Sequence, residues 1–435
     1  MTTYSPPAQP DGGAAQRKEL NRRTLVGVSL GNALEVFDWT AYAVLAPFFA
    51  SQVFNPADPT SALLSTLLVF GAGFVVRPFG GALFGWIADR RGRRASLMAA
   101  IACASVGMAL IATVPTYEQA GIWAGLVLLV ARLLQGLAHT GEVAAAYTYV
   151  AEEAPSERRG LWSSAIYVSG YMAIMVATIL GAVLATTLSD ASMNAWGWRL
   201  PFVLGAILGV VTLGLRRRMN ETELFERHVG TEVVRRSLIK DLWMHRAAGL
   251  RVFVLMGSLT AMFYAWVVSG PSWATSVAGL ERSSALWAGV VALAVGVVAL
   301  PVFGAMSDRF GRRLNVVLFG VLTAVLAFPL EWLGRQGLAQ FLVAMTVAVL
   351  VYSLVASVLP AVLCELFPTS VRASGVAVPY ALSAVVFGGT APYLQQWAAQ
   401  SGHGALFTGY LAVAGLLGAA LMAVTPETRD VDLNH

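Results

Sequence analysis

Long apolar runs, separated by short polar segments, recur along almost the whole chain. Most runs could cross a hydrocarbon core of about 30 Å as a helix that rises about 1.5 Å per residue. The pattern therefore predicts twelve transmembrane helices. They lie near residues 25–53, 61–87, 95–114, 121–150, 161–187, 198–215, 250–278, 285–306, 314–333, 338–363, 374–398 and 405–424.

Composition strengthens this interpretation. Hydrophobic residues make up 57% of the chain and charged residues 12%, whereas soluble domains average about 25% charged residues. We expect an all-α polytopic membrane protein whose surroundings are the lipid bilayer. Cys103 and Cys364 lie in separate predicted spans, which indicates no disulfide framework.

The basic residues are distributed unevenly between the predicted loops. If the N-terminus is cytoplasmic, 24 of the 29 lysines and arginines fall on the cytoplasmic side. This asymmetry follows the positive-inside rule and predicts that both termini lie in the cytoplasm. We expect the protein to lie in the bacterial inner membrane. Because topology explains the net charge of +5, that charge does not indicate a nucleic-acid partner.

A charged segment after the sixth predicted span divides the spans six and six. The segment reads "RRRMNETELFERHVGTEVVRRSLIKDLWMHR" and resembles a linker with some amphipathic helix. The predicted parts are a cytoplasmic tail (1–23), a six-helix bundle (24–215), a cytoplasmic linker (216–248), a second six-helix bundle (249–425) and a cytoplasmic tail (426–435).

An internal repeat supports this division. The loop after the second span reads "GWIADRRGRR" from Gly85, and the loop after the eighth reads "GAMSDRFGRR" from Gly304. A looser pair follows the fourth and tenth spans, "EEAPSERRG" at 152–160 and "ELFPTSVRASG" at 365–375. Duplicated halves with a substrate site between them are typical of one large class of transporters.

The repeated loops supply candidate gate residues. Glycines let neighbouring helices approach closely, and an aspartate can cap a helix N-terminus or pair with arginines. We expect such contacts to hold the cytoplasmic side shut in one conformation and to break in the other. A simpler alternative is that basic loops only satisfy topology. The candidates are Gly85, Asp89, Arg90, Arg93, Gly304, Asp308, Arg309, Arg312, Glu365 and Arg372.

The paired "DRxGRR" loops resemble the hallmark of the major facilitator superfamily. Further stretches resemble its metabolite:proton symporter family, which transports organic acids and zwitterionic osmolytes. They are "GNALEVFDW", "RPFGGALFGWIADRRGRR", "RLLQGLAHTGE", "EEAPSERRG", "WGWRLPF" and "ELFPTSVRASG". The resemblance implies the major facilitator fold and import with protons through a cavity that opens alternately to either side.

Several charged side chains lie inside predicted spans. Glu35 and Asp38 fall in the first span, Arg77 in the second, and Arg132 and Glu142 in the fourth. A charge at the bilayer centre costs about 2.5–3.5 kcal/mol on insertion scales, so such residues are functional candidates. By helical spacing, Asn32, Glu35, Trp39 and Tyr42 share one stripe, and Arg132, Gln135, His139 and Glu142 share another.

The buried charges predict a proton site. Three acids against two arginines leave one excess carboxylate, which binds a proton more readily than it stays charged away from water. We expect Asp38 to carry the proton, with Glu35, Glu142 and His139 as the other coupling candidates. Alternatively, the charges form ion pairs that hold helices in register. Glu142 could then serve the gate, and His139 could be a packing residue.

The arginines predict an anionic or zwitterionic small-molecule substrate. Arginine grips a carboxylate through two hydrogen bonds, so we expect Arg132, and secondarily Arg77, to bind it. Gln135, Asn32 and Tyr42 are further candidate substrate ligands. We expect no buried charge in the second half, which supplies Tyr264 and Tyr380 as candidate cavity walls, unless they only pack.

Together these features predict a proton-coupled symporter that imports a small organic acid or zwitterionic metabolite by alternating access. It is expected to function as a monomer, without metal or cofactor, on the proton motive force. A proton-coupled exporter of drug-like molecules and a receptor on a carrier scaffold remain alternatives. The chain shows no metal-ligand spacing, nucleophile elbow or phosphate loop, so an enzyme is not expected.

Overall fold

The structure is a computed structural model of the 435-residue chain. It describes residues 32–33, 36–80, 83–84, 87, 93–139, 147, 150–151, 154–216, 243–368 and 372–431. The predicted linker lies largely, and the predicted N-terminal tail entirely, outside these residues, whereas residues 426–431 of the predicted C-terminal tail are described. The predicted boundaries of the halves and the linker therefore stay predictions.

The described residues are almost entirely helical. In the first half, residues 36–53 form one helix, followed by α2 (Pro59–Val75), α4 (Arg93–Thr113), α5 (Tyr117–Ala120), α6 (Ile122–Ala138), α8 (Arg159–Thr187), α9 (Asp190–Ala195) and α10 (Leu200–Arg216). The second half contains α13 (Arg246–Met262), α14 (Gly270–Val277), α15 (Arg282–Phe310), α16 (Arg312–Gly334), α17 (Leu338–Ala356), α18 (Leu359–Glu365), α19 (Arg372–Ser383), α20 (Ala391–Gln400) and α21 (Gly404–Ala423).

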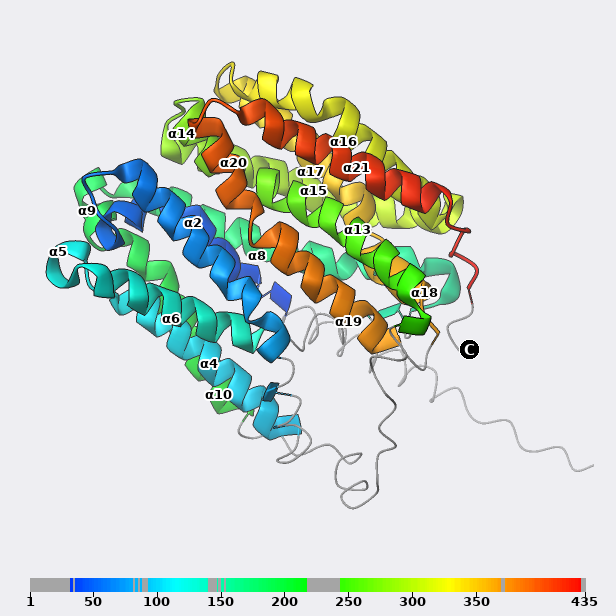
Figure 1. The fold of residues 1–435 in the computed structure, drawn as a ribbon, viewed down its shortest axis with the longest axis horizontal. Coiled ribbons are helices and arrows are strands. Elements are labelled where there is room, and N and C mark those ends of the chain that lie inside the picture. Colours follow the sequence, from blue (N-terminus) through cyan, green and yellow to red (C-terminus); the bar gives the residue numbers. More distant parts are fainter. Residues whose placement is uncertain are drawn as a thin grey trace, which may run out of the picture.

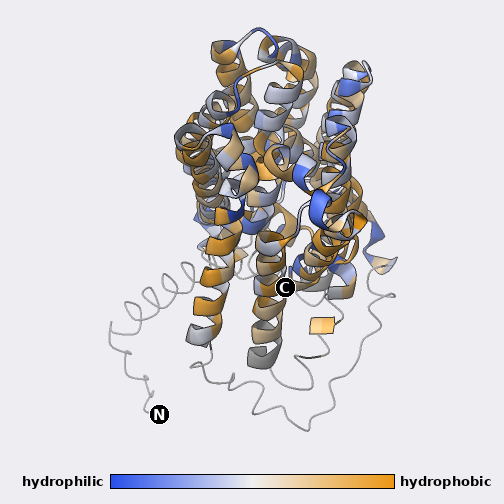
Figure 2. Ribbon diagram, turned by 90° about the vertical axis from the view of Figure 1, so that its left-hand side faces the viewer, coloured by the Kyte–Doolittle hydropathy of each residue, from blue (hydrophilic) through white to orange (hydrophobic). Residues whose placement is uncertain are grey.

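The helices have the length and composition of membrane spans. Among the described residues, nine helical segments of 18 to 32 residues are long and apolar enough to cross a membrane. Two shorter apolar helices, Met98–Thr113 and Ile122–Ala138, and the helix over 36–53 bring the set to the twelve predicted spans. Figure 2 shows most of their residues toward the hydrophobic end of the scale.

Local sequence signals set several helix ends. Asp58 accepts a hydrogen bond from the Ser61 backbone N–H and caps α2, with Pro59 at its first position. Glu281 caps α15 in the same way, through the backbone N–H groups of Ser283 and Ser284. Gly311, between α15 and α16, has φ of +99°, a conformation that favours glycine.

Two spans of the second half are interrupted, next to the stretches "SGPSW" at 269–273 and "FGGTAP" at 387–392. The seventh span changes from α13 to a π-helical turn at Phe263–Val268 and continues as α14. The eleventh changes from α19 to a π-helical turn at Ala384–Gly388 and continues as α20. Both interruptions adjoin the cavity described below, since Tyr264 and Ala384 line it.

The first and second halves lie side by side and meet along two helix pairs (Figure 1). In one pair, α8 runs along α15, and a Cβ atom on Gly304 would lie 2.7 Å from the carbonyl oxygen of Gly160. In the other, α2 meets the eleventh span, where a Cβ atom on Gly71 would lie 2.3 Å from the carbonyl oxygen of Gly389. Glycine at these positions lets the backbones touch.

Close backbone contact within the first half gives a stability prediction. A Cβ atom on Gly136 of α6 would lie 2.0 Å from the carbonyl oxygen of Gly73 in α2. We expect Gly136→Ala to lower the free energy of unfolding by about 1–3 kcal/mol through overpacking. Thermal unfolding of the purified chain in detergent measures this effect. Gly214→Ala is the matched control, because nothing lies within 4 Å of its added Cβ atom, and equal melting temperatures for both variants would contradict the prediction.

Candidate functional site

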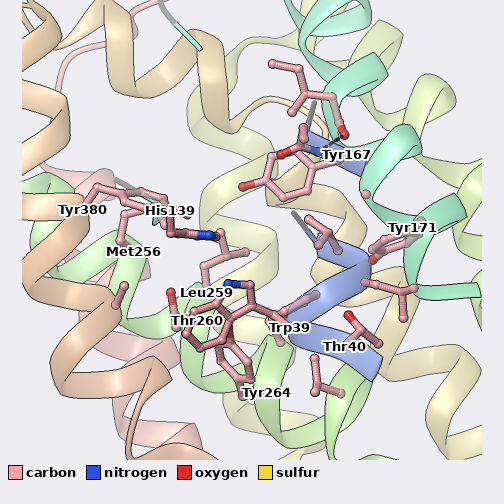
Figure 3. Close-up of a pocket in the computed structure, with 18 of the residues that line it drawn as sticks. Trp39, Thr40, His139, Tyr167, Tyr171, Met256, Leu259, Thr260, Tyr264 and Tyr380 are labelled. Carbon is pink, nitrogen blue, oxygen red and sulfur yellow. Dashed lines mark hydrogen bonds between the residues drawn. The ribbon is translucent and has the colours of Figure 1, made fainter. Parts of the chain in front are cut away.

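A cavity lies between the two halves and is lined by both. It holds about 890 Å³ of space not filled by atoms, its opening to solvent included. The first half contributes Asn32, Trp39, Thr40, Phe74, Arg77, His139, Tyr147, Tyr167 and Tyr171, and the second half Met256, Leu259, Thr260, Phe263, Tyr264, Tyr352 and Tyr380, among others. Figure 3 shows Trp39, Tyr167, Tyr264 and Tyr380 around one common space.

Two arginines pack against Trp39. The guanidinium carbon of Arg132 lies 3.8 Å from the centroid of the Trp39 ring, and that of Arg77 lies 4.4 Å from it. Arg132 also lies 4.5 Å from the Tyr42 ring, and Arg77 lies 4.0 Å from the Phe74 ring. Aromatic faces attract cations, so these rings partly replace the water that the guanidinium groups lose.

Gln135 connects Arg132 to the acid of the first span. Arg132 Nη1 donates to Gln135 Oε1 at 2.7 Å, and Gln135 Nε2 donates to Asp38 Oδ1 at 2.6 Å. Arg132 is 0% exposed, and its Nε and Nη2 atoms have no hydrogen-bond partner among the described residues. The amide therefore bridges a buried cation and a partly buried carboxyl group on two different helices.

The structure divides the predicted site residues into two sets. Asn32, Arg77, His139, Tyr264 and Tyr380 line the cavity. Four other candidates, Asp38, Tyr42, Arg132 and Gln135, do not line it.

The second set lies behind the cavity wall. Tyr42 is turned away and donates from its hydroxyl to the Thr66 carbonyl at 2.9 Å. Arg77, the secondary candidate for binding substrate, lines the cavity. Arg132, the primary candidate, does not line it and packs on the Trp39 ring, which does. Which arginine binds the substrate stays a prediction. Glu35 and Glu142 lie outside the described residues.

A cluster of tyrosines was not among the predicted site residues. Tyr167 and Tyr171 of the first half meet Tyr352 of the second, with ring centroids 6.4 and 6.0 Å apart, and Tyr147 meets Tyr380 at 6.2 Å. The Tyr147 and Tyr167 hydroxyls lie 2.7 Å apart, and the Tyr171 hydroxyl lies 3.1 Å from the Ser353 hydroxyl. The spacing of Tyr167 and Tyr171, one helical turn apart in an otherwise apolar span, was the available signal.

The second-half copy of the repeated loop binds the start of α8. Asp308 Oδ1 and Oδ2 accept hydrogen bonds from the backbone N–H groups of Gly160 and Leu161 at 2.8 and 2.9 Å. Arg312 Nη1 lies 2.7 Å from Asp308 Oδ1. The carboxylate thus meets the positive N-terminus of a helix in the other half. Gly85, Asp89, Arg90 and the side chain of Arg93 lie outside the described residues, and Arg309 is exposed.

The end of the molecule that carries Arg159, Arg312 and Arg372 is called here the arginine-rich end. Glu365 is 6% exposed there and lies 3.6 Å from Arg312 Nε and 4.0 Å from Arg159 Nη1. Arg372 Nε donates to the carbonyl oxygen of Cys364 at 3.3 Å. The second half therefore does contain buried charge, but it is gathered at a span end instead of the cavity.

The last described residues, 424–431, cross the arginine-rich end and are called the C-terminal strap. Glu427 accepts hydrogen bonds from the backbone N–H groups of Arg312 and Arg313 at 2.8 and 3.1 Å. The Thr428 hydroxyl donates to Glu365 at 2.7 Å, and Arg159 Nη1 donates to the Val431 carbonyl at 2.7 Å. The strap thereby joins the second half to α8 of the first.

The described part of the chain holds no group of three histidine, cysteine, aspartate or glutamate residues that could bind a metal ion. The cavity lining offers aromatic rings, one arginine, one histidine and a few hydroxyl and amide groups. This set of side chains can bind a small molecule that has an apolar part and a negatively charged group.

Comparison with known proteins identifies the family. Residues 28–378 match the model of the Major Facilitator Superfamily, and the chain belongs to this superfamily. The xylose transporter XylE of E. coli, in a partially occluded inward open conformation, has a TM-score of 0.72 over 94% of this chain and 98% of its own. At 19% identity, that likeness shows the fold alone.

Curated relatives are transporters of metabolites. The chain is 37% identical over 374 residues to the alpha-ketoglutarate permease of Escherichia coli (strain K12), covering 85% of each protein. It is 31% identical over 404 residues to the citrate-proton symporter of Klebsiella pneumoniae, covering 90% of each. The predicted fold and family are confirmed, and the protein is a multi-pass membrane transporter for small molecules, not an enzyme.

The contact between Asp308 and α8 gives a prediction about the arginine-rich end. Asp308→Ala removes both the cap of α8 and one of the partners of Arg312, so the two halves should separate there more often. Cys364, which is 0% exposed next to Glu365, is a native reporter of that opening. In a Cys103→Ser background, we expect Asp308→Ala to speed alkylation of Cys364 by N-ethylmaleimide several-fold.

The control for this experiment is Asp430→Ala, because the side chain of Asp430 is 89% exposed. We expect its alkylation rate to equal that of the Cys103→Ser protein. Equal rates in the Asp308→Ala and Asp430→Ala proteins would show that the cap does not hold this end closed.

Proposed function

We propose that this transporter is a symporter that imports a small carboxylate together with a proton by alternating access. One observation carries the proposal. Arg77 lines a cavity between the halves, and the Asp38–Gln135–Arg132 chain lies directly behind the same tryptophan ring. A cation that faces the substrate and an acid that can take a proton are thus linked through Trp39.

Asp38 is proposed as the proton carrier. Its carboxyl group is partly buried and accepts a hydrogen bond from Gln135, a neutral amide. A carboxylate in such surroundings loses hydration without direct pairing to a cation, which favours binding of a proton. Proton binding neutralises Asp38. The electrostatic attraction between Asp38 and Arg132, which Gln135 bridges, then becomes weaker.

The relatives support the transport of carboxylates with protons. One is named an alpha-ketoglutarate permease and another a citrate-proton symporter. An arginine on the cavity wall suits an anionic substrate better than the uncharged or cationic molecules that drug exporters handle. Import of an organic acid is therefore preferred over export of a drug-like molecule.

The driving force is proposed to be the proton motive force, without a metal or cofactor. One charge moved across 100 mV supplies about 2.3 kcal/mol, and a tenfold gradient requires about 1.4 kcal/mol. One net charge per cycle therefore supports roughly fifty-fold accumulation. For a monoanion carried with one proton the charges cancel, and the pH gradient alone drives uptake.

The proposed setting is the bacterial inner membrane with the arginine-rich end in the cytoplasm. The concentration of lysines and arginines in one set of loops supports this orientation. The cavity is built from the two halves of a single chain, which supports function as a monomer.

Removal of the titratable group tests the proton site. We expect Asp38→Asn to abolish uphill uptake of carboxylate into proteoliposomes under an inward proton gradient. Exchange of labelled for unlabelled substrate should continue, since the amide mimics the protonated acid. A variant that still accumulates substrate under a pH gradient would exclude Asp38 as the carrier.

The two arginines should differ in what they contribute. We expect Arg77→Lys to raise KM about tenfold or more, because an ammonium group cannot make the bidentate contact with a carboxylate. Arg132→Lys should lower the transport rate more than it changes KM, because Arg132 acts through Gln135 and Trp39. Initial uptake rates over a range of substrate concentrations separate these effects. Unchanged KM in Arg77→Lys would remove this residue from the substrate site.

A further inference from the structure

We infer that the transported compound is a monocarboxylate that carries an aromatic ring, of the benzoate type. This inference rests on the proposed function, because it specifies the substrate of the same cavity. It is carried by the distribution of charge and rings over the cavity wall.

The cavity wall concentrates its positive charge at one place. Among the described lining residues, Arg77 is the one with a permanent charge, and it packs on the Trp39 and Phe74 rings. His139 lies beside it, with its ring centroid 5.4 Å from that of Trp39, and can add a hydrogen bond to the same carboxylate. One carboxylate is thereby accommodated at this end.

A second carboxylate would meet an unfavourable surface. Away from Arg77, the described wall consists mainly of aromatic rings and of aliphatic side chains such as Ile174, Met256 and Leu259; its other polar groups, those of Asn32, Thr40 and Thr260, are uncharged. An ionised group placed against such surfaces loses its hydration without gaining a cation. Dicarboxylates and tricarboxylates are therefore disfavoured relative to a single carboxylate on an apolar body.

The rings form a surface suited to another aromatic ring. Tyr352 lies at its centre, stacked on Tyr171 with centroids 6.0 Å apart and tilted against Phe263 at 5.4 Å. Tyr264 meets Phe74 edge to face at 5.6 Å. Aromatic groups prefer such offset and edge-to-face neighbours, and a planar ring inserted among them finds both kinds.

Three of the tyrosine hydroxyls in the cavity wall, those of Tyr147, Tyr167 and Tyr171, already have hydrogen-bond partners. Tyr147 and Tyr167 share a hydrogen bond with each other, and Tyr171 shares one with Ser353. Because these hydroxyls are already paired, their rings supply mainly apolar contact to a ligand. A polyhydroxylated molecule would have to break these bonds, whereas an aromatic body leaves them intact.

Binding and transport of a small panel test the inference. Full-length protein in detergent is titrated with benzoate, cyclohexanecarboxylate, succinate, citrate and glycine betaine by calorimetry. We expect benzoate to bind at least about tenfold more tightly than succinate, citrate or glycine betaine, and more tightly than cyclohexanecarboxylate. Tighter or equal binding of succinate, citrate or glycine betaine, or no binding of benzoate, would overturn the inference.

Variants separate the roles of charge and ring. Tyr352→Leu should weaken benzoate about tenfold while changing cyclohexanecarboxylate little, and Tyr352→Phe should restore benzoate binding. Arg77→Gln should weaken benzoate but leave the weak binding of benzyl alcohol unchanged. Equal losses of benzoate and cyclohexanecarboxylate in Tyr352→Leu would mean that the ring surface does not select for aromaticity.

Flux measurements distinguish failure of this inference from failure of the proposed function. Uptake of each compound into proteoliposomes is measured with and without an inward proton gradient. Proton-driven flux that prefers succinate, citrate or glycine betaine would leave the symporter proposal standing and overturn the aromatic substrate class. Selective binding of benzoate without flux of any compound would support the ligand class and overturn the symporter proposal.

Discussion

Burial of the Arg132 guanidinium is the constraint on which the first half depends. A fully buried cation is tolerated only where other groups replace its hydration. Here Trp39 and Tyr42 offer their ring faces, and Gln135 accepts one hydrogen bond and passes the contact on to Asp38. The helix over residues 36–53 and α6 are thereby fixed against each other. The same arrangement places an acid that can titrate behind the wall of the cavity.

The halves are joined by two different kinds of contact. Where α2 meets the eleventh span, glycines allow backbone to touch backbone. At the arginine-rich end, by contrast, charge holds the halves together through Asp308, Arg312 and Glu365. Contacts of packed backbone tolerate small rotations, whereas a capped helix terminus is either bound or released. The charged contacts at the arginine-rich end therefore suit a gate with two states, and the glycine contact suits a hinge that is kept in both states.

The sequence predicted the fold well because each span carries its own signal. Apolar runs and the repeated "DRxGRR" loops are patterns of residues that lie close together in the sequence. The site was predicted less completely. Helical spacing places Arg132 and Gln135 on one face of a helix, but it does not identify the residue that lies between them and the cavity. Trp39 hides that pair and leaves Arg77 on the wall. The tyrosine cluster depends on contacts of Tyr167 and Tyr171 in the first half with Tyr352 in the second, and no local pattern contains such contacts.

The C-terminal strap has a consequence for biogenesis. Residues 424–431 are synthesised after the last described span, α21, yet they carry Glu427 to the start of α16 and the Val431 carbonyl to Arg159. The arginine-rich end therefore cannot be completed before the residues that follow α21 have been synthesised. Termination of synthesis directly after α21 would release every described span into the membrane but leave the arginine-rich end unfastened.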